Sequence, residues 1–296
     1  MRHNMISLGQ RAIQGEYNTV LMAGELRVQD SRIKHLNCAG QVRVTKSTLG
    51  RVQCVGELIA EGSGFTRLAV TGEAKLSGIC NGDIVEITGS ITAEYLESRI
   101  LSNGTGKKSK NQNQNNSQEQ SQKQSQNRDC SWQGVFYAES FENCSDLFLD
   151  FEYKFKNIIS YAKLFSRSEI ECEEFYSFSS LEAEAVNADR ILLLTQGEVK
   201  VGQLTGETIT ISRGYQPDQR FKRLPKTRGY KNQNDKITIA SIGIMEADHI
   251  EVEYVKAGLI SGTEVIIGDL CIIDRVEYRG SIKISDKAVV NEVVKL

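Results

Sequence analysis

The sequence predicts an all-β chain folded as a parallel β-helix, a solenoid in which each coil stacks on the one before it. Three observations lead to this prediction. Glycine recurs at spacings of 16, 16, 16 and 17 residues, apolar residues flank each glycine at alternate positions, and no helical periodicity accompanies the pattern. The five glycines are Gly24, Gly40, Gly56, Gly72 and Gly89.

The residues two and four positions before and after each glycine are apolar in all five units. Two positions before the glycine, for example, they are Met22, Cys38, Cys54, Val70 and Ile87. A period of two sends one set of side chains inward and the other to solvent. Sixteen residues are too few for a βαβ crossover, and hairpin turns are missing at the unit boundaries, so each unit is expected to form one full coil. Glycine supplies backbone freedom where the coil bends.

Cys38 and Cys54 fall in one inward column and are expected to lie about 4.8 Å apart along the axis. The pair is open to two interpretations: a disulfide or metal pair, or two small apolar thiols in a core. The apolar neighbours in this column favour the second. The seven cysteines show no CxxC spacing, so neither a disulfide framework nor a zinc site is predicted. Reduced thiols fit a cytoplasmic protein.

The opening residues "MRHNMISLGQ" lack the apolar run of a secretory signal, and no stretch approaches the roughly 18 apolar residues of a membrane span. The formal net charge of −2 is too small to indicate a class of binding partner. We therefore expect a cytoplasmic protein, with association at the membrane surface left open.

We expect three regions along the chain. Residues 1–102 form N-terminal coils, residues 103–130 form a linker, and residues 131–296 form C-terminal coils. The linker is rich in Asn, Gln, Ser and Lys, and residues 103–128 have no apolar side chain, so it is expected to be disordered. Further on, "VEYRGSIKI" at 276–284 repeats the glycine-centred template of the first coils.

A basic loop at 213–236 interrupts the C-terminal coils, with eight Lys or Arg against two Asp. It is a candidate contact for an anionic membrane surface or a protein partner. The alternative is a solvated excursion from one coil, which the 26 acidic against 20 basic residues of 131–296 favour. No nucleic-acid partner is expected. The candidate contact residues are Arg220, Lys222, Arg223, Lys226 and Arg228.

No catalytic, cofactor-binding or metal-ligating set is predicted, and neither a cofactor nor a small-molecule substrate is expected. Glu57 stacked on Glu73 is open to interpretation as an acid pair of a carbohydrate-active β-helix enzyme. The neighbouring column, with Arg43 and Lys75, has the opposite charge. A solvated face whose charges neutralise one another explains this pattern better.

The glycine-centred coils of residues 20–93, together with "ADHIEVEYVKAGLISGTEVIIGDLCIIDRVEYRGSIKI" at 247–284, resemble the bactofilin, or polymer-forming cytoskeletal protein, family of bacteria. The chain is similar to elongated Gram-positive-type members, and it departs from the family pattern in its length and its internal linker. The resemblance implies a right-handed parallel β-helix that assembles end to end into filaments without nucleotide, often near the membrane or the cell-shape and motility machinery.

The favoured function is therefore a non-enzymatic scaffold that associates with copies of itself. A solenoid ends in unpaired strand edges and an apolar cross-section, so the end coils are the expected contacts. The alternatives are a binding or adhesion module that uses the basic loop, and the carbohydrate-active enzyme. The candidate end residues are Val20, Met22, Leu26 and Val28 in the first coil and Ile282, Ile284, Val289 and Val293 in the last.

Overall fold

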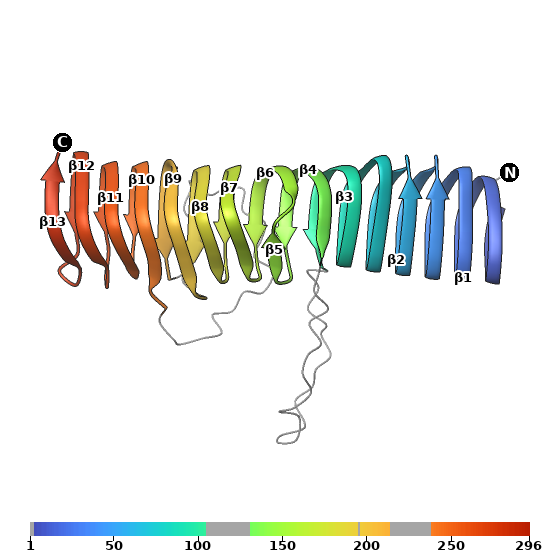
Figure 1. Cartoon of the computed structure of the whole chain (residues 1–296), viewed down its shortest axis with the longest axis horizontal. Coiled ribbons are helices and arrows are strands. Elements are labelled where there is room, and N and C mark those ends of the chain that lie inside the picture. Colours follow the sequence, from blue (N-terminus) through green and yellow to red (C-terminus); the bar gives the residue numbers. More distant parts are fainter. Residues whose placement is uncertain (1–2, 105–130, 195, 214–237) are drawn as a thin grey trace, which may run out of the picture. The chain divides into compact units, whose positions relative to one another are not determined.

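The computed structural model describes residues 3–104, 131–194, 196–213 and 238–296. Within these residues the chain is all-β with no helix, and its parallel strands form a β-solenoid of about 13 turns (Figure 1). The fold class predicted from the sequence is therefore confirmed.

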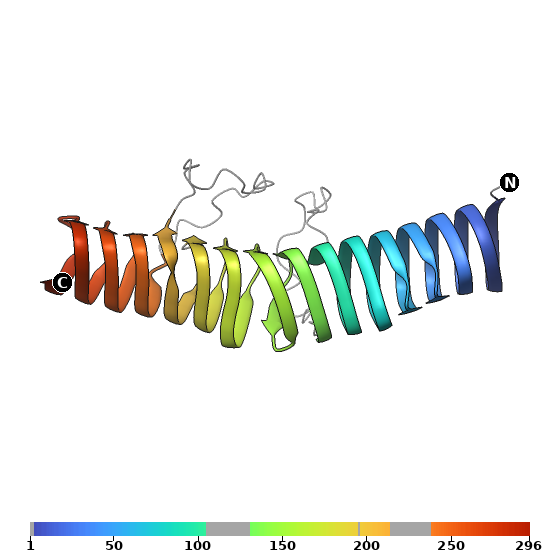
Figure 2. The ribbon, with the colours of Figure 1, turned by 90° about the horizontal axis from the view of Figure 1, so that it is seen from above.

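The chain divides into two compact units. The N-terminal unit consists of Met1–Glu139 with Phe151–Tyr153, and the C-terminal unit consists of Ser140–Asp150 with Lys154–Leu296. Within each unit, successive coils place their strands side by side, as both views show (Figures 1 and 2).

The N-terminal unit contains long strands that continue through their bends, because the backbone stays extended on both sides of each glycine. They are β1 (His3–Thr45), β2 (Thr48–Glu61), β3 (Gly64–Asn103) and the first part of β4 (Trp132–Asn143).

The β1–β2 and β2–β3 ladders keep one register. Arg32 pairs with Thr48 and Thr48 pairs with Gly64, each sixteen residues later, and every pair of these two ladders has the same spacing. The predicted inward column is confirmed, since Cys38 pairs with Cys54 and Cys54 with Val70, all buried.

The C-terminal unit is built from shorter strands separated by turns. These are β5 (Leu147–Leu149), β6 (Glu152–Ser160), β7 (Leu164–Ser177), β8 (Leu181–Leu194), β9 (Val199–Ser212), β10 (Ala240–Val252), β11 (Val255–Ile267), β12 (Ile272–Ile284) and β13 (Val289–Lys295).

The register of this unit varies from coil to coil. Ala240 pairs with Val255, fifteen residues on, whereas Leu181 pairs with Val199, eighteen residues on. Irregularities break the ladder in the β7–β8 pair, after Ser166, and in the β11–β12 pair, after Gly262.

The glycine column occupies one corner of the N-terminal unit. Gly24, Gly40, Gly56, Gly72 and Gly89 all have φ between +125° and +133°. A Cβ atom at Gly56 would clash with the carbonyl oxygen of Gly40, and the same holds up the column. Both the positive φ and the close approach require glycine, which explains the exact recurrence seen in the sequence.

A ladder of buried serines stabilises a second corner of the same unit. The Oγ of Ser47 accepts a hydrogen bond from the N–H of Ser31 (3.0 Å) and donates one to the carbonyl of Thr45 (2.8 Å). Ser63 repeats this arrangement sixteen residues later, accepting from the N–H of Ser47 at 3.2 Å and donating to Glu61 at 2.9 Å. Each hydroxyl thus satisfies a corner N–H and a corner C=O that would otherwise be buried without a partner.

The 26 residues 105–130 are inserted at the glycine corner. The N–H of Gly104 donates to the carbonyl of Ile87 (2.7 Å), and the N–H of Ile91 donates to the carbonyl of Ser131 (2.9 Å). The segment therefore leaves and re-enters the solenoid where the coil below has only Gly89 and Ser90. The predicted linker began at 103, but Asn103 is buried at the end of β3. The rest of the linker prediction lies outside the described residues.

Residues 214–237 are inserted at a different corner, between β9 and β10. In the next coil the corresponding corner consists of Glu253 and Tyr254 alone, between β10 and β11. The backbone N–H of Arg213 donates to a carboxylate oxygen of Glu253 (2.9 Å), and the N–H of Glu253 donates to the carbonyl of Ile211 (2.9 Å). Arg213, the residue that precedes the insertion, is thus held against the next coil.

Candidate functional site

The four residues predicted to form the N-terminal end surface are not at an end. Val20, Met22, Leu26 and Val28 are between 0% and 5% exposed. Residues 3–19 form a further coil that stacks on them, so the prediction was wrong for these four. A weak signal of this coil is present in the sequence, because Gly9 lies fifteen residues before Gly24. The structure confirms that these glycines stack, since a Cβ at Gly24 would clash with the Gly9 carbonyl oxygen.

The outermost coil at this end carries polar side chains at inward positions. Counted from Gly9, Ser7 and Arg11 occupy the columns that Met22 and Leu26 occupy in the next coil. The Nε of Arg11 donates a hydrogen bond to the Oγ of Ser7 (2.9 Å). This pair gives the N-terminal end a partly polar cover, as terminal repeats of solenoids commonly have.

The predicted C-terminal residues do lie on the terminal coil. Ile282 stacks on Val265 and Ile284 on Ile267, both in inward columns, but Ile284 is 41% exposed while Ile267 is buried. These inward-facing side chains are therefore uncovered on their outer side.

Strand β13 continues the same surface. Val293 stacks on the buried Val276 and is 46% exposed, so it faces inward and is uncovered. Val289 stacks on the exposed Ile272, so it belongs to an outward column and not to the end surface. Val290, which stacks on the buried Ile273, takes its place. The apolar alternation alone did not show which of Val289 and Val290 faces inward, because the turn before β13 changes which alternate positions of the strand point to the core.

Strand β13 is also an edge strand. It is the last strand in the sheet order and pairs only with β12 among the described strands. We define the C-terminal end surface as the free edge of β13 together with Ile282, Ile284, Val290 and Val293.

The basic-loop candidates Arg220, Lys222, Arg223, Lys226 and Arg228 lie outside the described residues.

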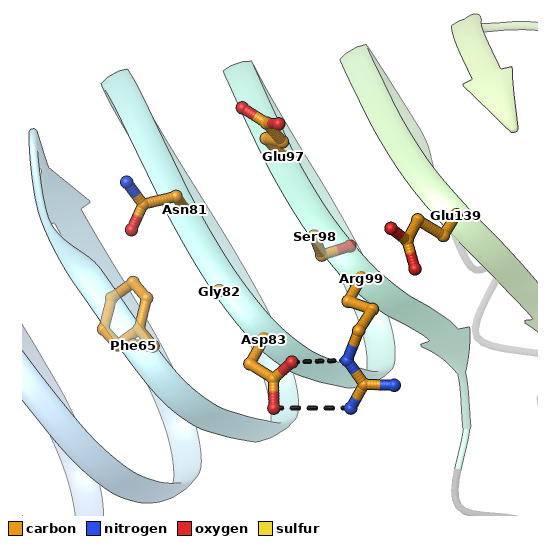
Figure 3. A pocket seen from close by; sticks show the side chains of 8 residues that line it. All are labelled: Phe65, Asn81, Gly82, Asp83, Glu97, Ser98, Arg99 and Glu139. Carbon is orange, nitrogen blue, oxygen red and sulfur yellow. Dashed lines mark hydrogen bonds and ion pairs between the residues drawn. The ribbon is translucent and has the colours of Figure 1, made fainter.

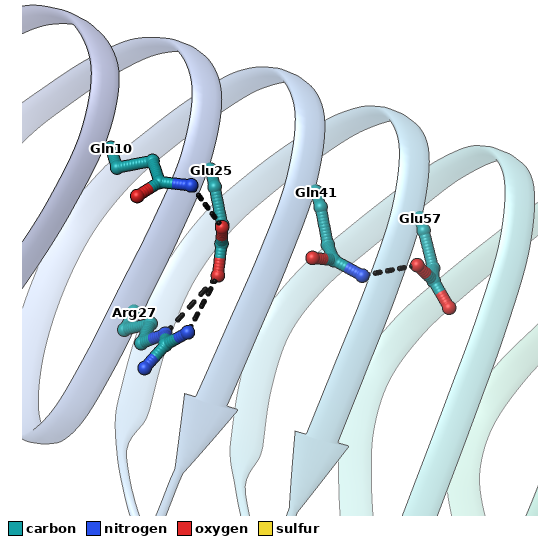
Figure 4. Close-up of polar contacts among 5 residues, drawn as sticks. All are labelled: Gln10, Glu25, Arg27, Gln41 and Glu57. Atoms are coloured by element: carbon teal, nitrogen blue, oxygen red, sulfur yellow. Dashed lines mark hydrogen bonds and ion pairs between the residues drawn. The ribbon is translucent and has the colours of Figure 1, made fainter.

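Lys75 contacts both members of the acid pair that the sequence suggested, Glu57 and Glu73. Lys75 Nζ lies 2.9 Å from a carboxylate oxygen of Glu57 and 3.0 Å from one of Glu73. The side-chain amide of Gln41 also donates a hydrogen bond to Glu57 (Figure 4). In the coils before it, Gln10 and Arg27 donate to Glu25 in a similar way (Figure 4). The hydrogen bond from Lys75 lowers the pKa of Glu57, and the bond from Gln41 adds to this effect. A general acid needs a raised pKa, so this geometry favours a neutralised surface over an acid pair.

The stacked thiols Cys38 and Cys54 are free and buried. Burial raises the pKa of both, that of Cys54 to about 12, with a smaller contribution from Cys38. Both are therefore protonated near neutral pH and unreactive. Within the part of the chain that the structure describes, no group of three or more His, Cys, Asp or Glu is arranged to hold a metal ion.

A polar groove of about 420 Å³, which was not predicted from the sequence, opens on the N-terminal unit. Successive coils contribute to it (Figure 3), one with Phe65, the next with residues 81–83, the next with residues 97–99 and the last with Glu139. Its lining residues are Phe65, Asn81, Gly82, Asp83, Glu97, Ser98, Arg99 and Glu139.

One ion pair orders the groove. Arg99 Nε lies 2.6 Å from Asp83 Oδ1, and a second nitrogen of the guanidinium donates to Oδ2 at 3.4 Å. The hydrogen bond from Arg99 lowers the pKa of Asp83. Ser98 stands at an inward position but bears a hydroxyl, and this break in the apolar alternation is the sequence signal that could have revealed the groove.

Comparison with protein-family models, curated proteins and solved structures finds no match to this chain. The bactofilin resemblance therefore stays a prediction. None of the described residues belongs to a helix long and apolar enough to span a membrane.

Proposed function

We propose that the protein is a non-enzymatic structural scaffold that associates with copies of itself through the terminal coils of its solenoid and so forms a bacterial cytoskeletal polymer. The observation that carries the proposal is the C-terminal end surface, where inward-facing side chains are exposed beside the free edge of β13. The resemblance to the bactofilin family supports the same function, because that family assembles β-helices end to end. Cell shape or motility is the process it would serve, from the cytoplasm.

A second copy of the chain suits this surface because coil-on-coil contact is the packing used throughout each unit. Inside the C-terminal unit, Ile267 and Val276 are buried by the side chains that stack on them. A coil of another molecule stacked in the same way would cover Ile284 and Val293. It would also pair the free N–H and C=O groups along β13, which otherwise remain a template for association.

Polar groups surround this apolar surface and would set its register. Arg275 contacts Glu292 at 3.2 Å, and Lys287 contacts Asp269 at 2.6 Å, both on the outward faces of the last two coils. An apolar centre with a charged rim is the usual anatomy of a specific protein interface.

The test measures assembly directly. The purified full chain is examined by light scattering across a concentration series and by negative-stain electron microscopy, beside the double variant Ile284→Lys, Val293→Glu. We expect concentration-dependent growth of the parent into filaments or rows of rods. The double variant should show a loss of assembly of at least tenfold in the concentration required, because it places two charges in the contact.

The matched control is Val289→Lys, which adds a charge to the same terminal coil but on an outward column. It should assemble as the parent does. Circular dichroism and thermal unfolding of all three proteins verify that the solenoid is intact. A parent that remains monomeric at every concentration, or a control that loses assembly as fully as the double variant, would overturn the proposal.

A further inference from the structure

We propose that the polar groove of the N-terminal unit binds a neutral polyhydroxylated ligand, a saccharide residue, with the Ser98 hydroxyl at its centre. This inference goes beyond the scaffold function and does not depend on it.

The first observation is the state of Ser98. Its residue is only 6% exposed, its Oγ is buried, and that oxygen has no hydrogen-bond partner among the described residues. Other buried serines of this unit, such as Ser47 and Ser63, have partners within the fold. A buried hydroxyl without a partner is destabilising, so a partner from outside the chain is expected.

The second observation is the groove that Ser98 helps to line. Ser98 follows Gly82 by sixteen residues, in the same column, and both residues belong to the lining. The Ser98 side chain lines the groove, which lies open to solvent between Asp83 on one coil and Glu139 on another (Figure 3). A volume of about 420 Å³ falls within the range of small-ligand sites.

The chemistry of the lining favours hydroxyl groups over ions. Asn81 and the guanidinium of Arg99 offer donors, while Glu97 and Glu139 offer carboxylate acceptors, and all four line the groove with Ser98. A ligand hydroxyl both donates and accepts, so it matches a serine hydroxyl and a carboxylate on neighbouring coils. An ammonium group only donates, and Arg99 repels it. An anion would face three carboxylates.

Spacing along the solenoid adds to this match. Coils repeat at about 4.8 Å, so Asp83, Arg99 and Glu139, on three successive coils, present polar groups at regular intervals. The Asp83–Arg99 pair fixes the orientation of two of these groups before any ligand arrives. Such preorganised polar side chains suit a ring with several adjacent hydroxyls.

The experiment uses the full-length chain and defined sugars. Saturation-transfer NMR and isothermal titration are carried out with glucose, galactose, mannose and N-acetylglucosamine and with their tetrasaccharides. We expect at least one saccharide to bind, and Ser98→Ala and Glu97→Gln to lower its affinity at least tenfold. Lys75→Ala, on the outward face away from the groove lining, should bind as the parent does.

Thermal unfolding of the same variants separates a binding role from a structural one. If Ser98 serves a ligand, Ser98→Ala removes an unpaired hydroxyl and should leave the melting temperature unchanged or raise it, while Ser63→Ala should lower it. Binding unaffected by Ser98→Ala, binding only of ammonium compounds such as spermidine, or no saccharide binding at all would each overturn the proposal.

Discussion

The two units reach the same solenoid by different means. The N-terminal unit keeps every β1–β2 and β2–β3 pair sixteen residues apart. The ladders of the C-terminal unit have spacings from fifteen to eighteen residues, apart from the β9–β10 pair that spans the second insertion, and two register irregularities. The N-terminal unit relies on the close approach of successive backbones at its glycine corner. The C-terminal unit tolerates variation because turns separate its strands, so that each coil can adjust its length without disturbing the next.

The cores differ accordingly. In the β1 and β2 coils the inward columns hold aliphatic side chains and cysteine, such as Leu36 on Val52 and Cys38 on Cys54. Aromatic contacts appear in the later coils of both units, with Tyr95 on Tyr137 in the N-terminal unit and Phe141 on Phe155, ring centroids 4.7 Å apart, in the C-terminal unit. Large rings fill the uneven space that coils of unequal length create. The comparison indicates that strict repetition and adaptable packing are alternative ways to stack coils.

The largest effect expected from this difference is at the glycine corners. Gly56→Ala introduces a Cβ at φ +130° that clashes with the Gly40 carbonyl oxygen, and we expect it to lower the free energy of unfolding by about 3–5 kcal/mol. Gly258→Ala in the C-terminal unit has no positive φ and a distance of 2.9 Å to the Gly243 oxygen, so its cost should be smaller. Urea unfolding of both variants measures the difference.

Gly9→Ala is the matched control for that experiment. Gly9 belongs to the same corner with φ +87°, but no atom lies within 4 Å of its added Cβ. It should therefore report backbone strain without the clash. Equal destabilisation by Gly9→Ala and Gly56→Ala would show that stacking of the column is not what requires glycine.

A middle-sized effect is expected at the buried polar corners. Ser47→Ala leaves the N–H of Ser31 and the carbonyl of Thr45 without their partner, at a cost of about 1–3 kcal/mol. Ser160→Ala is the counterpart in the C-terminal unit, where the Ser160 hydroxyl donates to Ala162 and accepts from Asn143, both at 2.8 Å. Thermal unfolding compares the two, and a change below 0.5 kcal/mol at Ser47, the range of ordinary surface substitutions, would contradict the ladder's stabilising role.

The smallest effect is expected from removing the inserted segment. Excising residues 106–130 joins Thr105 to Ser131. Asn103 already lies sixteen residues after Ile87, its neighbour in the coil below. After the excision Trp132 would likewise lie sixteen residues after its neighbour Ile91. With Thr105→Gly added to supply the corner glycine, we expect an unchanged circular dichroism spectrum and a melting temperature within a few degrees of the parent. Excising 101–126 instead, which has nearly the same length but removes Leu101 and Asn103 from β3, is the control and should destabilise the unit. An equal fall in melting temperature for both excisions would show that the inserted segment does not begin after Gly104.

Much of the fold could be predicted from the sequence, because a period of two and a sixteen-residue glycine spacing leave few architectures. The predicted inward columns around Cys38 and Cys54 are confirmed for this reason. The coil before Val20 was missed because Ser7 and Arg11 break its apolar pattern, which is what an end coil requires. The phase of β13 was missed at Val289, because a turn and not the alternation sets it. The groove was missed because a single polar residue at an inward position, Ser98, was not recognised as a break in the apolar alternation.

The insertion at the glycine corner has a consequence for anything that the chain carries there. The hydrogen bonds at Ile87 and Ile91 hold Gly104 and Ser131 at fixed points on one coil, whatever the number of residues between them. The corner is thus a length-independent attachment point, at which evolution or an engineer can exchange one segment for another while the coils above and below stay in register.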